Sequence, residues 1–158
     1  MRIWHYELLP YLPDRQFRGQ LRELVAILHD WRDKGKTNHL LINKVMEYRK
    51  SDLLLYFRIY RQEYLSRYKK DIKPAICKEF YDFGKVDDCY RDNPPFESWH
   101  DEEYLDLNMA NLYEKHLAVG NSRVTDEEWE RLVDGYNKIT GNCYVLKRKL
   151  ITTIEHLQ

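Results

Sequence analysis

The chain has 158 residues, of which 43% are apolar and 33% are charged, a size and composition that suit one domain with one hydrophobic core. Its longest apolar run, Leu53 to Phe57, is too short to span a membrane, and three cysteines without zinc-type spacing favour a reduced, cytoplasmic compartment. The net charge is zero, but residues 1–74 hold 16 Lys and Arg against 9 Asp and Glu, whereas residues 75–158 hold 10 against 17. The basic half predicts a polyanionic partner, and mutual neutralisation of the two halves is an equal alternative.

The first predicted elements are an extended segment and a long helix. Residues 1–13 are expected to be extended, because Pro10 and Pro13 each bias the preceding residue away from helix. Asp14 can cap a helix that runs to about Asp33. Apolar residues recur along this helix at amphipathic spacing, and those expected to face inward are Phe17, Leu21, Leu24, Val25, Leu28 and Trp31.

Two further helices are predicted in the basic half. A short one starts at Thr37 or Asn38, and a longer one runs from Ser51 to about Lys70. Tyrosines recur every four residues along the longer helix, a stripe more typical of packing than of base stacking. The residues expected to face inward on these two helices are Leu40, Leu41, Val45, Leu54, Leu55, Ile59, Tyr64, Leu65 and Tyr68.

The acidic half is predicted to hold the remaining helices. One or two helical turns are expected within residues 77–83. Asp101 and the two acids after it favour the start of a helix, because the helix dipole stabilises negative charge in the first turn. Thr125 and Glu128 have the spacing of a capping box for another helix, and residues 146–157 give a last one.

These elements predict the fold class and the domain organisation. We expect an all-α fold, a single compact domain of five or six helices with an extended N-terminal segment. The domain covers residues 1–158, with a basic half at 1–74 and an acidic helical half at 75–158. We also expect a monomer that does not bind membranes.

The first 24 residues carry the motifs that point to a family. They begin Met-Arg-Ile-Trp-His, place two prolines around Tyr11-Leu12, and then read Gln20-Leu21-Arg22-Glu23-Leu24. This block resembles the pyrimidine-dimer DNA glycosylase family, typified by phage endonuclease V, and resembles still more closely small bacterial and viral relatives that begin Met-Arg-apolar-Trp-His. The resemblance is weaker through Lys70 and thin beyond it. The resemblance implies a DNA repair N-glycosylase with AP lyase activity that acts on damaged or modified bases in double-stranded DNA. A pyrimidine dimer is the first candidate substrate, and no cofactor is expected.

The resemblance also implies a mechanism in which the α-amine of the chain attacks C1′ of the damaged nucleotide and forms an imine. An α-amine has a pKa of about 7.7–8.0, against about 10.4 for lysine, so part of it is neutral at pH 7. Phage-type enzymes expose a threonine amine by losing their initiator methionine, but Arg2 is too large for methionine removal here. We therefore expect the Met1 amine to be the nucleophile. Glu23 matches the catalytic glutamate, and Arg22 matches a residue that contacts phosphate and positions the strand.

Further residues are expected to contact DNA. The resemblance suggests Arg2, and the basic character of the first half suggests Arg15, Arg18 and Lys36. A solvated helix face is the alternative for the last three. Ala26 stands where phage-type relatives carry another basic residue, so the path of the DNA is expected to differ.

The histidines are expected to be mainly structural. His5 is a candidate for orienting the terminus or the substrate, with a hydrogen-bonded structural role as an equal alternative, whereas His39 and His116 fall on predicted apolar faces. No pair of histidines has metal-ligand spacing with a nearby carboxylate, so no metal is expected.

Two alternatives stay open at this point. Glu23 can be the structural partner of Arg22 or Arg2, since ion pairs far outnumber catalytic acids. The whole chain can also be a catalytically inactive helical DNA-binding or protein-interaction module of the same fold.

Overall fold

The structure, a computed structural model, describes residues 2–36, 38–87, 93–120 and 123–141. These residues form six α-helices and two 3-10 helices and include no β-strand, which confirms the predicted all-α fold. The elements in chain order are η1 (Tyr6–Tyr11), α1 (Asp14–Asp33), α2 (Leu40–Met46), α3 (Lys50–Tyr68), α4 (Pro74–Gly84), η2 (Lys85–Asp87), α5 (Glu102–Leu117) and α6 (Asp126–Thr140). Among the helices of the described ranges, none is long and apolar enough to cross a membrane.

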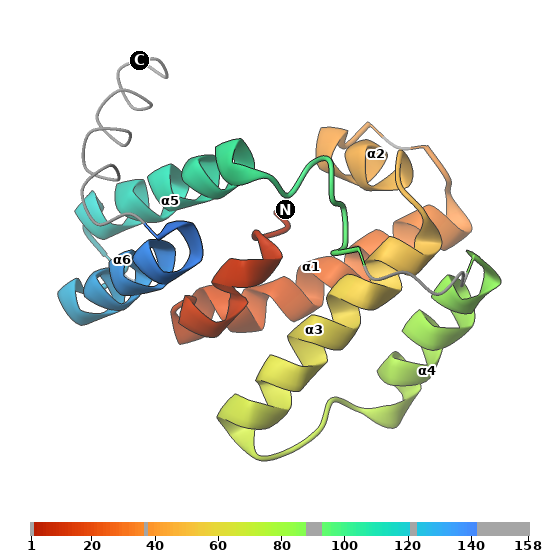
Figure 1. The fold of residues 1–158 in the computed structure, drawn as a ribbon. Helices are drawn as coiled ribbons and strands as arrows, with labels where there is room; N and C mark the ends of the chain where they lie inside the picture. Colours follow the sequence, from red (N-terminus) through yellow and green to blue (C-terminus); the bar gives the residue numbers. More distant parts are fainter. Residues whose placement is uncertain (1, 37, 88–92, 121–122, 142–158) are drawn as a thin grey trace.

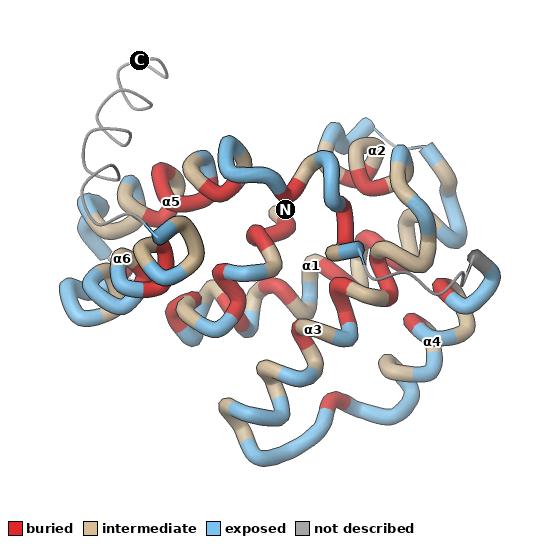
Figure 2. Tube along the Cα trace, viewed as in Figure 1, coloured by how far each residue is buried: buried red, intermediate tan, exposed pale blue. Residues whose placement is uncertain are grey.

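The helices surround the beginning of the chain. Figure 1 shows α3 and α4 side by side on one side of the molecule, α5 and α6 on the other, and α1 between them. The 3-10 helix η1 contacts both α3 and α6, so it joins the two sides. Figure 2 shows that the first described residues lie in the middle and are largely buried. The most buried of them are Ile3, Trp4, His5, Leu8, Leu9 and Leu12.

The prediction of an extended segment over residues 1–13 is wrong for its second half. Tyr6–Tyr11 is a 3-10 helix, whose first turn is capped by the His5 side chain accepting from the Glu7 N–H. At its other end the Arg67 guanidinium donates to the carbonyls of Leu9 and Leu12, at 2.7 and 2.8 Å. Proline bias was therefore outweighed by side chains that satisfy the ends of a compact turn.

The predicted first helix is confirmed, since α1 spans Asp14–Asp33. Phe17, Leu24 and Leu28 are buried as expected. Gln20 is also fully buried, which the amphipathic pattern did not predict because glutamine counts as polar in it. This glutamine becomes important at the site.

The predicted starts and inward faces of α2 and α3 are partly wrong. The α2 helix begins at Leu40, whose side chain is 85% exposed, while Ile42 and Val45 are buried. His39, expected in the core, is exposed at the N-cap of this helix. In α3 the residues fully or nearly buried are Leu53, Leu54, Tyr56, Phe57 and Tyr60. Because α3 packs against both η1 and α4, its buried face is wider than one amphipathic stripe.

Two helices of the acidic half begin close to where the sequence predicts. Asp101 accepts a hydrogen bond from the Tyr104 N–H at 2.8 Å at the start of α5, and Thr125 with Glu128 forms the capping box of α6. His116 is half-buried, with Nδ1 3.1 Å from the Val124 carbonyl oxygen. Pro74 is the first residue of α4, a position where its missing N–H costs no helix hydrogen bond. The predicted helix over residues 146–157 lies outside the described residues.

Candidate active site

A pocket of about 340 Å³ lies beside the first described residues and α1. Its wall combines four cationic side chains with one carboxylate. The residues that line it are Arg2, Trp4, Arg15, Gln16, Gly19, Arg22, Glu23 and Lys115. Four of the residues singled out in the sequence are therefore neighbours here, namely Arg2, Arg15, Arg22 and Glu23.

Glu23 is hydrogen-bonded to the backbone at the beginning of the chain. The Arg2 N–H donates to Glu23 Oε2 at 2.8 Å, and the carboxylate is half-buried in the pocket wall. Arg22, the residue before it on α1, is exposed at the rim. Met1, the predicted nucleophile, lies outside the described residues. The carboxylate is thus held at the first peptide bond of the chain.

The Gln20 side chain forms two hydrogen bonds with the backbone of the N-terminal segment. Its Nε2 donates to the Arg2 carbonyl at 2.9 Å, and its Oε1 accepts from the Trp4 N–H at 2.8 Å. One side chain thus takes a donor and an acceptor two residues apart on the extended backbone. Since Gln20 and Glu23 are three residues apart on α1, they lie on the same face of that helix.

Two tyrosine hydroxyls hold the same segment from other helices. Tyr56 of α3 donates to the Trp4 carbonyl at 2.7 Å, and Tyr104 of α5 donates to the Ile3 carbonyl. Burial raises the pKa of Tyr104 to about 12 and raises the pKa of Tyr56 well above its ordinary value. Both hydroxyls therefore stay protonated and remain donors at neutral pH.

The α5 helix supplies two further anchors from outside the basic half. Asn108 Oδ1 accepts from the His5 N–H at 2.9 Å, and Asn111 Oδ1 accepts from the Arg2 guanidinium at 3.1 Å. The Arg2 guanidinium also lies over the Trp4 ring, 4.9 Å from its centroid. The orientation of Arg2 toward the pocket is therefore fixed by one amide and one aromatic ring.

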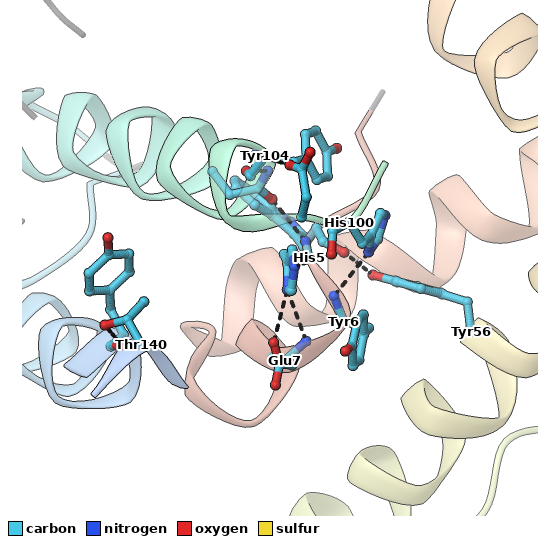
Figure 3. A network of polar contacts seen from close by, with 11 residues as sticks. His5, Tyr6, Glu7, Tyr56, His100, Tyr104 and Thr140 are labelled. Atoms are coloured by element: carbon cyan, nitrogen blue, oxygen red, sulfur yellow. Dashed lines mark hydrogen bonds and ion pairs between the residues drawn. The ribbon is translucent and has the colours of Figure 1, made fainter. Parts of the chain in front are cut away.

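His5 lies in a different environment from the pocket. Its ring is 2% exposed, with Nε2 2.9 Å from the His100 carbonyl oxygen and Nδ1 accepting from the Glu7 N–H at 3.3 Å (Figure 3). A carbonyl can only accept, so Nε2 carries the proton and the ring is neutral. Burial lowers the pKa of His5 below its ordinary value, which favours the same neutral form. This arrangement is that of a structural histidine.

His100 completes the buried histidine pair. Its Nδ1 accepts from the Tyr6 N–H at 3.3 Å, and its ring centroid lies 5.2 Å from that of His5. Burial, and to a smaller extent the neighbouring His5, lowers the pKa of His100 to about 2. The pair therefore joins the N-terminal segment to the start of α5 in its uncharged form.

Two predicted DNA contacts do not line the pocket. Arg18 forms an ion pair with Asp14 at 2.7 Å and lies over the Tyr68 ring, and it is not among the residues that line the pocket. Lys36 is exposed beyond the far end of that helix. Both remain predictions as contacts to a longer DNA strand, separate from the pocket itself.

The sequence interpretation missed the side chains that position the site. Gln20 lies within the family-like motif, and the signal for its role is a glutamine at a helical core position. Lys115, Asn108 and Asn111 are three to seven residues apart on α5, the spacing of one helix face, but nothing in the sequence places that face beside residue 2. Within the described ranges, no group of three or more His, Cys, Asp or Glu side chains is placed to hold a metal ion.

Comparison with known proteins gives a family match. No curated protein and no solved structure matches the chain. Residues 1–74 match the family model described as pyrimidine dimer DNA glycosylase. The matched range contains Arg2, Arg22 and Glu23 of the pocket and ends before α5 begins. This match supports the resemblance to the pyrimidine dimer DNA glycosylase family that the first 24 residues predict.

Proposed function

We propose that this protein is a DNA N-glycosylase with AP lyase activity, in which the Met1 α-amine forms an imine with C1′ of a damaged nucleotide. The observation that carries the proposal is the hydrogen bond from the Arg2 N–H to Glu23 Oε2, inside a pocket with four cationic side chains. The match of residues 1–74 to the family model supports the glycosylase class, with a pyrimidine dimer as the first candidate lesion.

The length of the covalent chain supports a role for an amine on residue 1 beside the carboxylate. Three bonds separate that nitrogen from the Arg2 amide nitrogen, so the two atoms are within about 4 Å of each other in any conformation. Glu23 Oε2 is 2.8 Å from the Arg2 nitrogen. A carboxylate at this place can exchange protons with the amine, directly or through one water, and can stabilise a cationic sugar.

The proposed reaction has two stages. The neutral amine attacks C1′, the N-glycosidic bond breaks, and the base leaves with the bonding electrons and takes up a proton. Opening of the sugar ring gives a protonated imine at C1′, with the ring oxygen taking a proton. Loss of a C2′ proton then expels the 3′ phosphate and cuts the strand. Glu23 acts as the acid and base, and Arg2 and Arg22 hold phosphates of the reacting strand.

The decisive experiment is reductive trapping on DNA. Untagged protein is incubated with a duplex that carries one abasic site, and borohydride is added to reduce any imine. We expect a covalent adduct whose peptide map places the DNA on the Met1 peptide. Intact mass measured beforehand tests whether Met1 is retained with a free amine. Folded protein that gives no adduct would show that the imine mechanism is wrong.

A variant separates the role of Glu23 from the fold. Glu23→Gln keeps the shape of the side chain and an acceptor for the Arg2 N–H but removes the charge. We expect its trapping and cleavage rates to fall by about 100-fold or more, because general acid–base catalysis contributes about 10²–10⁴-fold. Glu130→Gln, on the exposed side of α6, is the matched control and should leave the rate unchanged. Equal rates for both variants would make Glu23 a structural residue.

Blocking the amine distinguishes the enzyme from an inactive binder. Acetylation of the N-terminus removes the nucleophile and leaves the basic pocket in place. We expect trapping to disappear while affinity for the abasic duplex changes little. Affinity without trapping in the unmodified protein would favour the alternative, a helical DNA-binding module.

A further inference from the structure

Gly19 is a glycine that the fold does not require. It is the sixth residue of α1, where glycine is less favourable than alanine for helix formation. A Cβ added at Gly19 would meet no atom within 4 Å outside its own helix, and its φ is not in the left-handed region. Gly84 and Gly135, by contrast, lie directly against Leu54 and the Tyr11 ring. Neither packing nor backbone conformation explains a glycine at position 19.

The position of Gly19 within the pocket suggests another reason. It lines the pocket with Arg15 one turn before it and with Arg22 and Glu23 one turn after it. Residues at these spacings are neighbours on one face of a helix. The face therefore has long cationic side chains at both ends and bare backbone in the middle. Such a notch lets a ligand approach the helix backbone closely.

We propose that Gly19 is the point of closest approach of the reacting DNA strand, whose sugar and phosphate pass over the bare turn between Arg15 and Arg22. This inference rests on the proposed function. The sugar must come within about 3–3.5 Å of the attacking amine. The Arg2 N–H, which is next to the proposed amine in the chain, donates to Glu23, one turn from Gly19. A large side chain at position 19 would occupy the notch and hold the strand several ångströms away.

The test replaces Gly19 by residues of increasing size. Gly19→Ala removes the helix cost, and we expect its melting temperature to rise by about 2–4 °C. Gly19→Leu keeps a strong helix former and fills the notch. We expect it to lower both the affinity for a duplex with a tetrahydrofuran abasic analogue and the borohydride trapping rate by about tenfold or more, without lowering the melting temperature. Ser66→Leu, on an exposed turn of α3 away from the pocket, is the control for adding an apolar side chain.

The outcomes separate the inference from the function on which it rests. Wild-type protein that neither binds nor traps the abasic duplex would disprove the proposed function. Active wild-type protein with an equally active Gly19→Leu variant would overturn only the role of Gly19. A lower melting temperature for Gly19→Ala or Gly19→Leu would also overturn it, because glycine would then be a requirement of the fold. Equal losses in Ser66→Leu would assign the effect to surface hydrophobicity and reject the notch.

Discussion

Gln20 shows at the level of a single residue how the site is positioned. Its amide binds the Arg2 carbonyl and the Trp4 N–H, and its Oε1 also accepts from the Tyr56 hydroxyl at 3.2 Å. Each buried amide group that loses its hydrogen-bond partner lowers the free energy of unfolding by about 1–3 kcal/mol. The Gln20 side chain therefore has a large effect on stability for its size. It determines where the backbone of residues 2–4 lies relative to Glu23.

Replacing Gln20 by Leu keeps the volume and removes all three hydrogen bonds. We expect the free energy of unfolding to fall by about 2–4 kcal/mol, because the Trp4 N–H is left buried without a partner. Urea denaturation followed by circular dichroism measures this change. Gln16→Leu, one turn earlier on α1 and half-buried, is the control and should change stability by about 0.5 kcal/mol or less. Equal effects of the two substitutions would contradict the role of the Gln20 amide.

At the level of elements, α6 packs closely against η1 because a glycine lies at their contact. Gly135 lies in the middle of α6, and its backbone contacts the Tyr11 ring. A Cβ there would overlap the ring atoms Cγ, Cδ1 and Cδ2, so the two elements can approach this closely only with glycine. The Arg131 guanidinium donates to the Pro10 carbonyl at 2.5 Å beside the same contact.

The two interior helix glycines should therefore respond in opposite directions to the same change. Gly135→Ala gains helix propensity but forces α6 away from η1, and we expect a net loss of about 1–3 kcal/mol in the free energy of unfolding. Gly19→Ala, with open space around it, should instead be stabilised. Thermal denaturation of both variants measures the difference in stability. A stabilised Gly135→Ala variant would contradict the prediction, because the contact between α6 and the Tyr11 ring would then adapt to the added Cβ without cost.

The whole molecule is joined through its first residues, and the buried histidine pair makes this junction sensitive to pH. The folded-state pKa values of His5 and His100 lie below the ordinary value of 6.5. In the unfolded chain both rings take up protons near that value, so the unfolded state binds more protons at mildly acid pH. The stability that the neutral pair provides is fully present above about pH 6.5 and is lost as pH falls toward the lowered values.

We expect the free energy of unfolding to fall by about 1.4 kcal/mol per pH unit because of His100 between about pH 6 and 4.5, and His5 adds a fall in the same direction. Urea titrations at several pH values measure this slope. His100→Asn keeps an acceptor near the position of Nδ1 for the Tyr6 N–H, so it should be less stable at pH 7 but have a flatter pH dependence. His39→Asn, on the surface, should keep the wild-type slope. An unchanged slope in His100→Asn would assign the acid sensitivity to other groups.

The parts of this molecule that local patterns govern could be predicted, and the parts that depend on distant contacts could not. Amphipathic spacing placed α1 from Asp14 to Asp33, and capping chemistry placed the start of α6 at Thr125. The family motif identified Arg2, Arg22 and Glu23, which do share one pocket. The 3-10 helix at Tyr6–Tyr11 depends on Arg67, which is 55 and 58 residues away from the carbonyls it binds. No local pattern carries that information.

Because α5 binds the N-terminal segment, the site can form only late in the synthesis of the chain. During synthesis the first residues leave the ribosome long before Asn108 and Asn111, which bind them. At about 5–20 residues per second, this delay is roughly 5–20 s. Throughout it, Arg2 and His5 lack the α5 side chains that bind them in the folded protein. The newly made chain therefore acquires its complete site only when the acidic half has been synthesised and α5 can pack against the first residues.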